Sequence, residues 1–379
     1  MPIAQLSMSE YDALPTSADV DRCVKEFCDS PPDPASFLPS TYTSIIHAGS
    51  GTFGDVYFCI PTSAITASMV NSTAQTEVTT ACTHLTKQLV AIKVCHGPSI
   101  PTLCNELAVL QIIATTNHAA AHNAACDSND TSCDAFFEVL DHATCPNDDA
   151  HYFTTTTLPL VCTLDALKSY FSSLPEVFTW LIYTRVGTAL HWLNKTCDPG
   201  VAHGDLHPGN ILIGYAFLLP TEGLYLPQIK LIDFGKSRIA NAEPGYEYAL
   251  CYDQTLRDDK SKFLYILAAM MGVVSFDGRP PNRSPKPGAA AGRTMDSRES
   301  REFSEFRTGV DRAVRRNSWD CEDSIVELEG LFRRIAEGKV EGAKVGEAKK
   351  IWGVMMDVAE ERCNGVQEKI EELIAGGPE

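Results

Sequence analysis

The chain has 379 residues, of which 44% are hydrophobic and 21% charged, so it can bury a sizeable core and is not disordered throughout. Its 31 Lys and Arg residues against 49 Asp and Glu residues give a net charge of −18. Such an acidic chain carries no strong nucleic-acid signal, because phosphate binding over a broad surface needs a basic face. At roughly 100–200 residues per domain, the length predicts two or three units.

Secretion, membrane insertion and zinc binding are all disfavoured. Residues Met1–Tyr11 lack a basic segment followed by an apolar core, so no signal peptide is expected. The longest apolar run, Phe263–Phe276, is shorter than the roughly 20 residues that span a bilayer. The 14 cysteines include no C-x-x-C pair and are expected to be reduced thiols in the interior. We therefore expect an intracellular protein, cytoplasmic or nuclear, with no membrane partner.

The order of the predicted elements is strands first and helices later. Strands are predicted at 42–60 (a hairpin around glycines), 89–95, 135–140, 152–160, 211–213 and 228–232. Helices are predicted at 102–114, 174–195, 263–274, 325–337 and 348–375. Residues 61–88 are rich in Thr, Ser and Ala without an amphipathic period, which predicts an inserted loop. The predicted elements are mainly strands before about residue 160 and mainly helices after it, which indicates an α+β chain of two parts.

Composition adds flanking segments to these two parts. The window 279–316 holds ten Lys and Arg residues against five Asp and Glu residues and begins with a run rich in Gly and Pro, which predicts a solvated linker. The predicted units are an acidic extension at 1–41, two main parts at 42–160 and 161–277, a basic linker at 278–319 and a helical C-terminal segment at 320–379.

A glycine-rich pattern between two predicted strands is the first motif with chemical content. Gly49, Gly51 and Gly54 form G-x-G-x-x-G, in which a backbone without Cβ atoms can close over phosphate oxygens. A Rossmann interpretation fails because residues 56–58 continue as strand rather than helix. By itself the motif is no more specific than an ordinary glycine-rich hairpin.

The next two motifs supply a cation and an anion. Lys93 ends the apolar strand V-A-I-K, where a lysine usually extends to solvent. Glu106 lies near the start of the helix predicted at 102–114, where a solvated carboxylate would be ordinary. Neither residue points to a site without the motifs that follow.

The last two motifs are more specific. In H-G-D-L-H-P-G-N, Asp205 and Asn210 place a carboxylate and an amide five residues apart before a short strand, which suits a base and a metal ligand. Asp233 begins D-F-G directly after an apolar strand. Either segment could be a structural turn, but five such motifs in this order are hard to obtain by chance.

In this order, the motifs resemble those of the protein kinase superfamily over roughly residues 42–275. The resemblance implies a bilobal protein-kinase-like fold, with a small mainly-β N-lobe at 42–160 and a larger mainly-α C-lobe at 161–277. It implies an enzyme that uses ATP and Mg²⁺ to phosphorylate a hydroxyl group, with protein Ser or Thr as the favoured acceptor and a protein substrate as the partner.

The resemblance also implies roles for individual residues. Nucleotide binding falls to Gly49, Gly51 and Gly54 over the phosphates, Val56 and Ala91 against the adenine, and Lys93 on the α- and β-phosphates. The catalytic set is Asp205 as base, Lys93 and Glu106 as an ion pair, and Asn210 and Asp233 as Mg²⁺ ligands. His203 is expected to anchor its loop, and either Asp258 or Asp259 to brace it.

Two positions depart from the usual pattern of the family. Gly204 stands where an arginine normally receives an activation phosphate, which implies that phosphorylation of Ser237 or Tyr246 is not required. His207 replaces the lysine of Ser/Thr kinases, and no A-P-E motif follows. H-G-D-L-H-P-G-N is also similar to the loop of aminoglycoside and choline-type kinases, so a small-molecule kinase is the alternative. A pseudokinase scaffold is a second alternative, although Lys93, Asp205 and Asp233 are all present.

Overall fold

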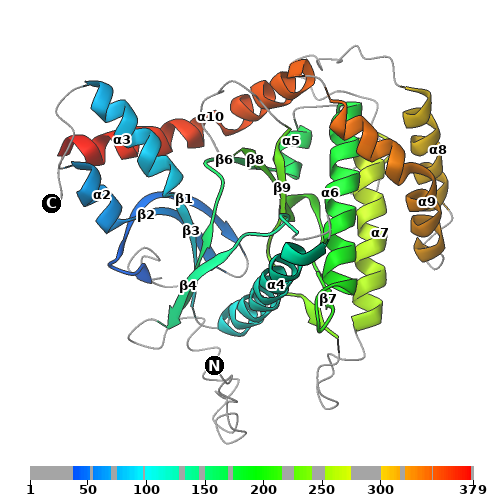
Figure 1. Cartoon of the computed structure of the whole chain (residues 1–379), viewed down its shortest axis with the longest axis horizontal. Helices are drawn as coiled ribbons and strands as arrows, with labels where there is room; N and C mark the ends of the chain where they lie inside the picture. Colours follow the sequence, from blue (N-terminus) through cyan, green and yellow to red (C-terminus); the bar gives the residue numbers. More distant parts are fainter. Residues whose placement is uncertain are drawn as a thin grey trace, which may run out of the picture.

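The described part of the chain is mixed α+β, with three β-sheets and a set of long helices (Figure 1). The computed structural model describes residues 37–51, 54–69, 75–96, 99–127, 133–144, 150–169, 174–215, 226–240, 252–274, 300–315, 321–343 and 345–376. Most of the acidic extension and the Gly- and Pro-rich run of the predicted linker lie outside these residues.

The first sheet is antiparallel and has the strand order β1-β2-β3-β5-β4. Its strands are β1 (Tyr42–Gly51), β2 (Gly54–Pro61), β3 (Val90–His96), β4 (Val139–Thr144) and β5 (Ala150–Thr156). The hairpin predicted at 42–60 is confirmed, with Gly51 opposite Gly54 at its turn. In the middle of the sheet, β3 pairs with both β2 and β5, so its side chains occupy the centre of the sheet.

The prediction of a loop at 61–88 is wrong for residues 62–69 and 75–87, which form two helices, while residues 70–74 lie outside the described residues. They are α2 (Thr62–Met69) and α3 (Gln75–Lys87), in which large apolar side chains are few. Ile65 and Leu85 are nevertheless buried, in one cluster with side chains from the far C-terminal helix. Packing against a distant segment stabilises helices whose own sequence pattern is weak.

Helix α4 (Ile100–Asp127) packs beside the first sheet, in contact with β3, β4 and β5. Its buried side chains include Leu103, Leu110 and Ile113, on the face that the predicted helix at 102–114 would bury. The helix extends well past the predicted end, since alanine, which has the highest helix propensity, is frequent in its second half.

The chain passes from the first sheet to the second between Thr156 and Leu160. The second sheet has the order β6-β8-β9 and comprises β6 (Leu160–Thr163), β8 (Ile211–Tyr215) and β9 (Gln228–Leu231). Between β6 and β8 lie α5 (Leu164–Ser169), α6 (Glu176–Lys195), β7 (Val201–Ala202) and the short helix η4 (Pro208–Asn210). After β9, β10 (Arg238–Ile239) pairs with β7.

Helices dominate the remainder of the chain (Figure 1). Helix α7 (Tyr252–Met270) packs with α6, and α8 (Arg301–Arg315) and α9 (Cys321–Glu341) pack against them. Helix α8 lies within the predicted linker 278–319, so that prediction is wrong for residues 301–315. Its Phe303, Phe306 and Val310 are buried at helical spacing, whereas the charged residues that suggested a linker occupy its other positions.

The last helix, α10 (Val345–Gly376), connects the two halves of the molecule. It crosses from the side of α5 and β6 to the side of α2, α3 and β1 (Figure 1). Val366 and Ile370 are fully buried there, beside Ile45, Leu85 and Val161. Within the described ranges, none of the helices is both long enough and apolar enough to cross a bilayer.

Candidate functional site

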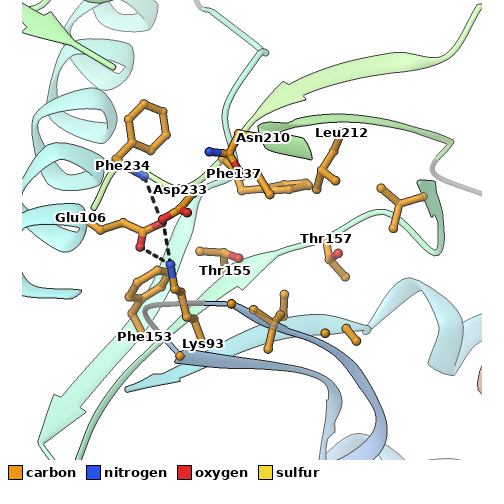
Figure 2. A pocket seen from close by; sticks show the side chains of 18 of the residues that line it. Lys93, Glu106, Phe137, Phe153, Thr155, Thr157, Asn210, Leu212, Asp233 and Phe234 are labelled. Carbon is orange, nitrogen blue, oxygen red and sulfur yellow. Dashed lines mark hydrogen bonds and ion pairs between the residues drawn. The ribbon is translucent and has the colours of Figure 1, made fainter. Parts of the chain in front are cut away.

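A pocket of about 340 Å³ lies between the first and second sheets (Figure 2). This volume is within the range of small-molecule sites. Nine residues selected from the sequence line it: Gly49, Gly51, Gly54, Val56, Ala91, Lys93, Glu106, Asn210 and Asp233. Asp205 is not among the lining residues but is hydrogen-bonded to one of them. The structure thus brings together residues that are far apart in the sequence.

The glycine hairpin forms one wall of the pocket. Gly54 has φ +143°, and a Cβ atom there would overlap the Val94 carbonyl oxygen on β3, so this position requires glycine. At Gly49, no atom lies within 4 Å of the place that a Cβ atom would occupy, so no close backbone contact requires glycine there. Gly49 lines the pocket, and its lack of a side chain leaves open space on that side. Next to it, Ser50 Oγ donates a hydrogen bond of 2.5 Å to Asp55 Oδ1, which holds the two strands of the hairpin together.

Lys93, on β3, is held between two carboxylates at the floor of the pocket (Figure 2). Its Nζ lies 2.6 Å from Glu106 Oε2, on α4, and 3.2 Å from Asp233 Oδ1, after β9. Burial lowers the pKa of Lys93, but the two carboxylates outweigh it and hold the pKa above its ordinary value. The side chain is therefore a fixed ammonium group that connects three elements.

The segment that follows β9 is held by α4. Glu106 Oε1 accepts a hydrogen bond of 3.3 Å from the Phe234 N–H. Asn105 Nδ2 lies within hydrogen-bond distance of the carbonyl oxygens of Phe234, Gly235 and Ser237. Sequence reasoning missed Asn105, because its role depends on backbone atoms that lie about 130 residues away in the chain.

Asp233 has a backbone conformation that is uncommon for a residue other than glycine. Its φ of +65° is in the left-handed region, which residues with a Cβ seldom adopt and which is enriched at functional sites. The two bonds from Glu106 and Asn105 to the following backbone maintain this conformation. The strained backbone keeps the Asp233 carboxylate beside Lys93 in the pocket.

His203 anchors the loop before η4 and is completely buried. Its Nε2 lies 3.0 Å from the Ile232 carbonyl oxygen, and burial lowers its pKa to about 4, so the ring is neutral at physiological pH. Asp259 braces the same loop by accepting hydrogen bonds from the backbone N–H groups of His203 (2.6 Å) and Gly204 (3.0 Å). The choice between Asp258 and Asp259 is thereby resolved, because Asp258 is exposed and bonds to Gln254.

Asp205 is connected to the pocket through Asn210 and bonds to a lysine through its carboxylate. Asn210 Nδ2 donates a 2.9 Å hydrogen bond to the Asp205 carbonyl oxygen, and Lys236 Nζ lies 2.9 Å from Asp205 Oδ2. Burial raises the pKa of Asp205, but the hydrogen bond and charge of Lys236 outweigh burial and bring the pKa below its usual value. Sequence reasoning missed Lys236, although its place directly after D-F-G was a usable signal.

Two residues of the predicted set could hold a divalent cation. Asn210 Nδ2 donates a hydrogen bond to the Asp205 carbonyl oxygen, which orients the amide and leaves Asn210 Oδ1 to bind a cation. Asp233 contributes a carboxylate in the same pocket. No group of three or more His, Cys, Asp or Glu side chains suited to a metal occurs in the described part of the chain. This donor set nevertheless fits Mg²⁺, which proteins commonly bind through one or two carboxylates together with substrate phosphates.

Ser237 is not placed to receive a phosphate. Its side chain is buried, and its hydroxyl donates a 2.9 Å hydrogen bond to the His203 carbonyl oxygen. A Ser237→Ala variant would therefore remove a structural bond as well as a hydroxyl, and it cannot test the expectation that phosphorylation is dispensable. Tyr246 lies outside the described residues.

Gly204 is required by the contact between the His203 loop and the segment after D-F-G. It has φ +80°, and a Cβ atom there would overlap the Lys236 carbonyl oxygen. We expect Gly204→Ala to lower the free energy of unfolding by at least about 1–2 kcal/mol, the cost of a left-handed backbone for an L-residue. Urea unfolding measures this loss.

The matched control for that substitution is Gly338→Ala in α9, where nothing lies within 4 Å of a Cβ atom. It should increase stability by about 1 kcal/mol, because alanine is the better helix former. If Gly204→Ala proves as stable as the wild type, the close approach of the two loops is not a constraint.

No protein-family model matches the chain, and no curated protein matches it either. The chemistry of the site therefore follows from its own residues and their geometry.

Proposed function

We propose that the protein is an ATP- and Mg²⁺-dependent phosphotransferase of the protein kinase type, with Ser and Thr hydroxyls of proteins as the favoured acceptors. The observation that carries this proposal is the convergence of separate motifs on one pocket, where Lys93 bridges Glu106 and Asp233 below the glycine hairpin. An antiparallel sheet with a glycine hairpin, followed by a mainly helical part, supports a two-lobed kinase-like architecture.

In this mechanism the residues mainly position and neutralise charge. Lys93 binds the α- and β-phosphates, and the hairpin from Gly49 to Gly54 covers them. A Mg²⁺ ion held by Asn210 and Asp233 would neutralise charge on the phosphates. The acceptor oxygen forms a bond to the γ-phosphorus while the bond to the bridging oxygen of ADP breaks, and Asp205 takes the hydroxyl proton.

A kinase for small-molecule hydroxyls is the second candidate. It is favoured by Gly204, whose left-handed backbone against Lys236 leaves no room for the arginine that protein kinases place there. His207 also differs from the lysine of protein kinases, and it accepts a hydrogen bond from the Gly209 N–H instead. The complete glycine pattern, V-A-I-K and D-F-G favour the protein kinase.

Transfer of label from ATP tests these candidates. Purified protein is incubated with γ-labelled ATP and Mg²⁺, alone, with generic protein substrates, and with a panel of hydroxyl metabolites. We expect label on protein Ser and Thr residues, and a rate at least about 100-fold lower for Asp205→Asn, which removes the base. Asp258→Asn is the matched control, because this exposed carboxylate does not contact the His203 loop.

Other outcomes identify the alternatives. Label on a metabolite but on no protein would support a small-molecule kinase instead of a protein kinase. Binding of ATP without any transfer would support a pseudokinase scaffold instead of an enzyme. Equal rates for Asp205→Asn and the wild type would contradict the role of Asp205.

A further inference from the structure

We propose that Lys236 binds the γ-phosphoryl group of the nucleotide on the Asp205 side of the site, an inference that rests on the phosphotransferase function proposed above. Lys236 would be a second phosphate-binding cation, separate from Lys93 and supplied by the residue directly after D-F-G. It deepens the proposed function by assigning a residue that the five motifs do not contain.

The backbone of Lys236 is fixed on both sides. Before it, the Gly235 carbonyl oxygen bonds to Asn105 on α4. After it, the Ser237 hydroxyl bonds to the His203 carbonyl oxygen and β10 pairs with β7. The Lys236 carbonyl oxygen itself lies against Gly204. The side chain therefore starts from a rigid position beside the loop that carries Asp205.

The end of the Lys236 side chain lies where the transfer would occur. Its Nζ is 2.9 Å from Asp205 Oδ2, and the side chain is 50% exposed. An acceptor hydroxyl bonded to Asp205 would lie about 3 Å from that carboxylate and about 3–3.5 Å from the phosphorus that it attacks. A flexible lysine bonded to the same carboxylate is within reach of the γ-phosphoryl oxygens.

Stability does not account for this ion pair. A largely exposed lysine–carboxylate pair contributes little to the stability of the fold, which is little reason to place a lysine beside the base. Lys93 cannot bind a γ-phosphoryl group beside Asp205, because Glu106 and Asp233 hold its Nζ at the floor of the pocket.

Two other basic residues near the loop are engaged differently. His207 Nδ1 accepts a hydrogen bond of 3.1 Å from the Gly209 N–H, so its side chain caps the short helix η4. Lys262 Nζ lies 3.5 Å from the Gly204 carbonyl oxygen, on the backbone of the loop. Lys236 is the cation that bonds to the Asp205 carboxylate itself.

In the transfer, Lys236 remains protonated. The acceptor oxygen bonds to the γ-phosphorus, the bond from that phosphorus to the bridging oxygen breaks, and ADP leaves with the electron pair. Asp205 receives the hydroxyl proton. The Lys236 ammonium donates a hydrogen bond to a non-bridging γ-oxygen, whose charge it stabilises throughout.

The test compares the binding of ADP and of a non-hydrolysable ATP analogue, each with Mg²⁺, by calorimetry. Only the analogue carries a γ-phosphoryl group. We expect Lys236→Met to weaken analogue binding about tenfold or more, the effect of one charge-assisted hydrogen bond, and to leave ADP binding within about twofold. The kcat should fall about 100-fold, with a smaller change in KM for ATP.

Two further variants control the result. Lys236→Arg keeps the charge and should retain the preference for the analogue. Lys369→Met removes a lysine of similar exposure that also lies 2.9 Å from a carboxylate, Glu372, on α10, and it should change neither affinity.

Two outcomes would overturn the inference, and they are distinguishable. In the first, the wild type binds the analogue more tightly than ADP, but Lys236→Met weakens the binding of both nucleotides equally or of neither. Lys236 then acts only by positioning Asp205. If the wild type binds neither nucleotide, the proposed phosphotransferase function fails and this inference fails with it.

Discussion

Lys93→Met is expected to lower the free energy of unfolding by about 3–5 kcal/mol, because it leaves a buried carboxylate without its partner. Glu106 is only 4% exposed and lies 2.6 Å from Lys93 Nζ. The same variant is expected to lose phosphoryl transfer by more than about 100-fold, because it removes the cation that we propose for the α- and β-phosphates. Chemical denaturation and labelled ATP measure the two effects.

A double variant separates these two effects. Lys93→Met combined with Glu106→Gln removes both charges, while the glutamine oxygen can still accept the hydrogen bond from the Phe234 N–H. We expect it to recover most of the lost stability but none of the transfer, since replacing both members of a buried ion pair costs far less than removing one. If transfer returned together with stability, Lys93 would be a structural residue and the site assignment would be wrong.

Phe306→Ala is expected to lower the free energy of unfolding by about 3–5 kcal/mol, the usual cost of truncating a buried aromatic side chain. Phe306, on α8, is fully buried, and its ring lies 4.5 Å from that of Trp180 and 5.3 Å from that of Phe332, measured between centroids. It therefore holds α8 against α6 and α9. Urea unfolding of the whole chain measures the loss.

The control for Phe306→Ala is Leu331→Ala, a neighbouring apolar truncation on α9. Leu331 is 59% exposed, so its removal should change stability by less than about 0.5 kcal/mol. If Phe306→Ala were equally harmless, α8 would not be part of the core, and the linker predicted at 278–319 would describe residues 301–315 after all.

The residues of the candidate site were easier to predict than the contacts that position them. Lys93 and Asp233 stand in short motifs, because the chemistry fixes both residue type and local spacing. Asn105 and Lys236 form their contacts with backbone or side chains far away in the sequence. Only the folded chain defines those contacts, although the place of Lys236 directly after D-F-G was a local signal for that residue.

The two errors in the fold have different physical causes. In residues 61–88, helices α2 and α3 depend on α10 for their packing, which a window confined to this segment cannot detect. In α8, the apolar residues at helical spacing were present, but the excess of basic residues over the wider window concealed them. In the first case, packing against a distant helix could not be predicted from the local sequence. In the second, the basic composition of the window was given more weight than the helical spacing of its apolar residues.

The position of α10 has a consequence for the order in which the protein folds during synthesis. Val366 and Ile370 complete the apolar cluster that contains Ile45 and Leu85. The ribosome therefore makes the first sheet and its two helices long before the residues that cover them. Until then this apolar surface stays exposed to other chains and is a target for chaperones. Closing contacts of such large sequence separation also makes folding slow.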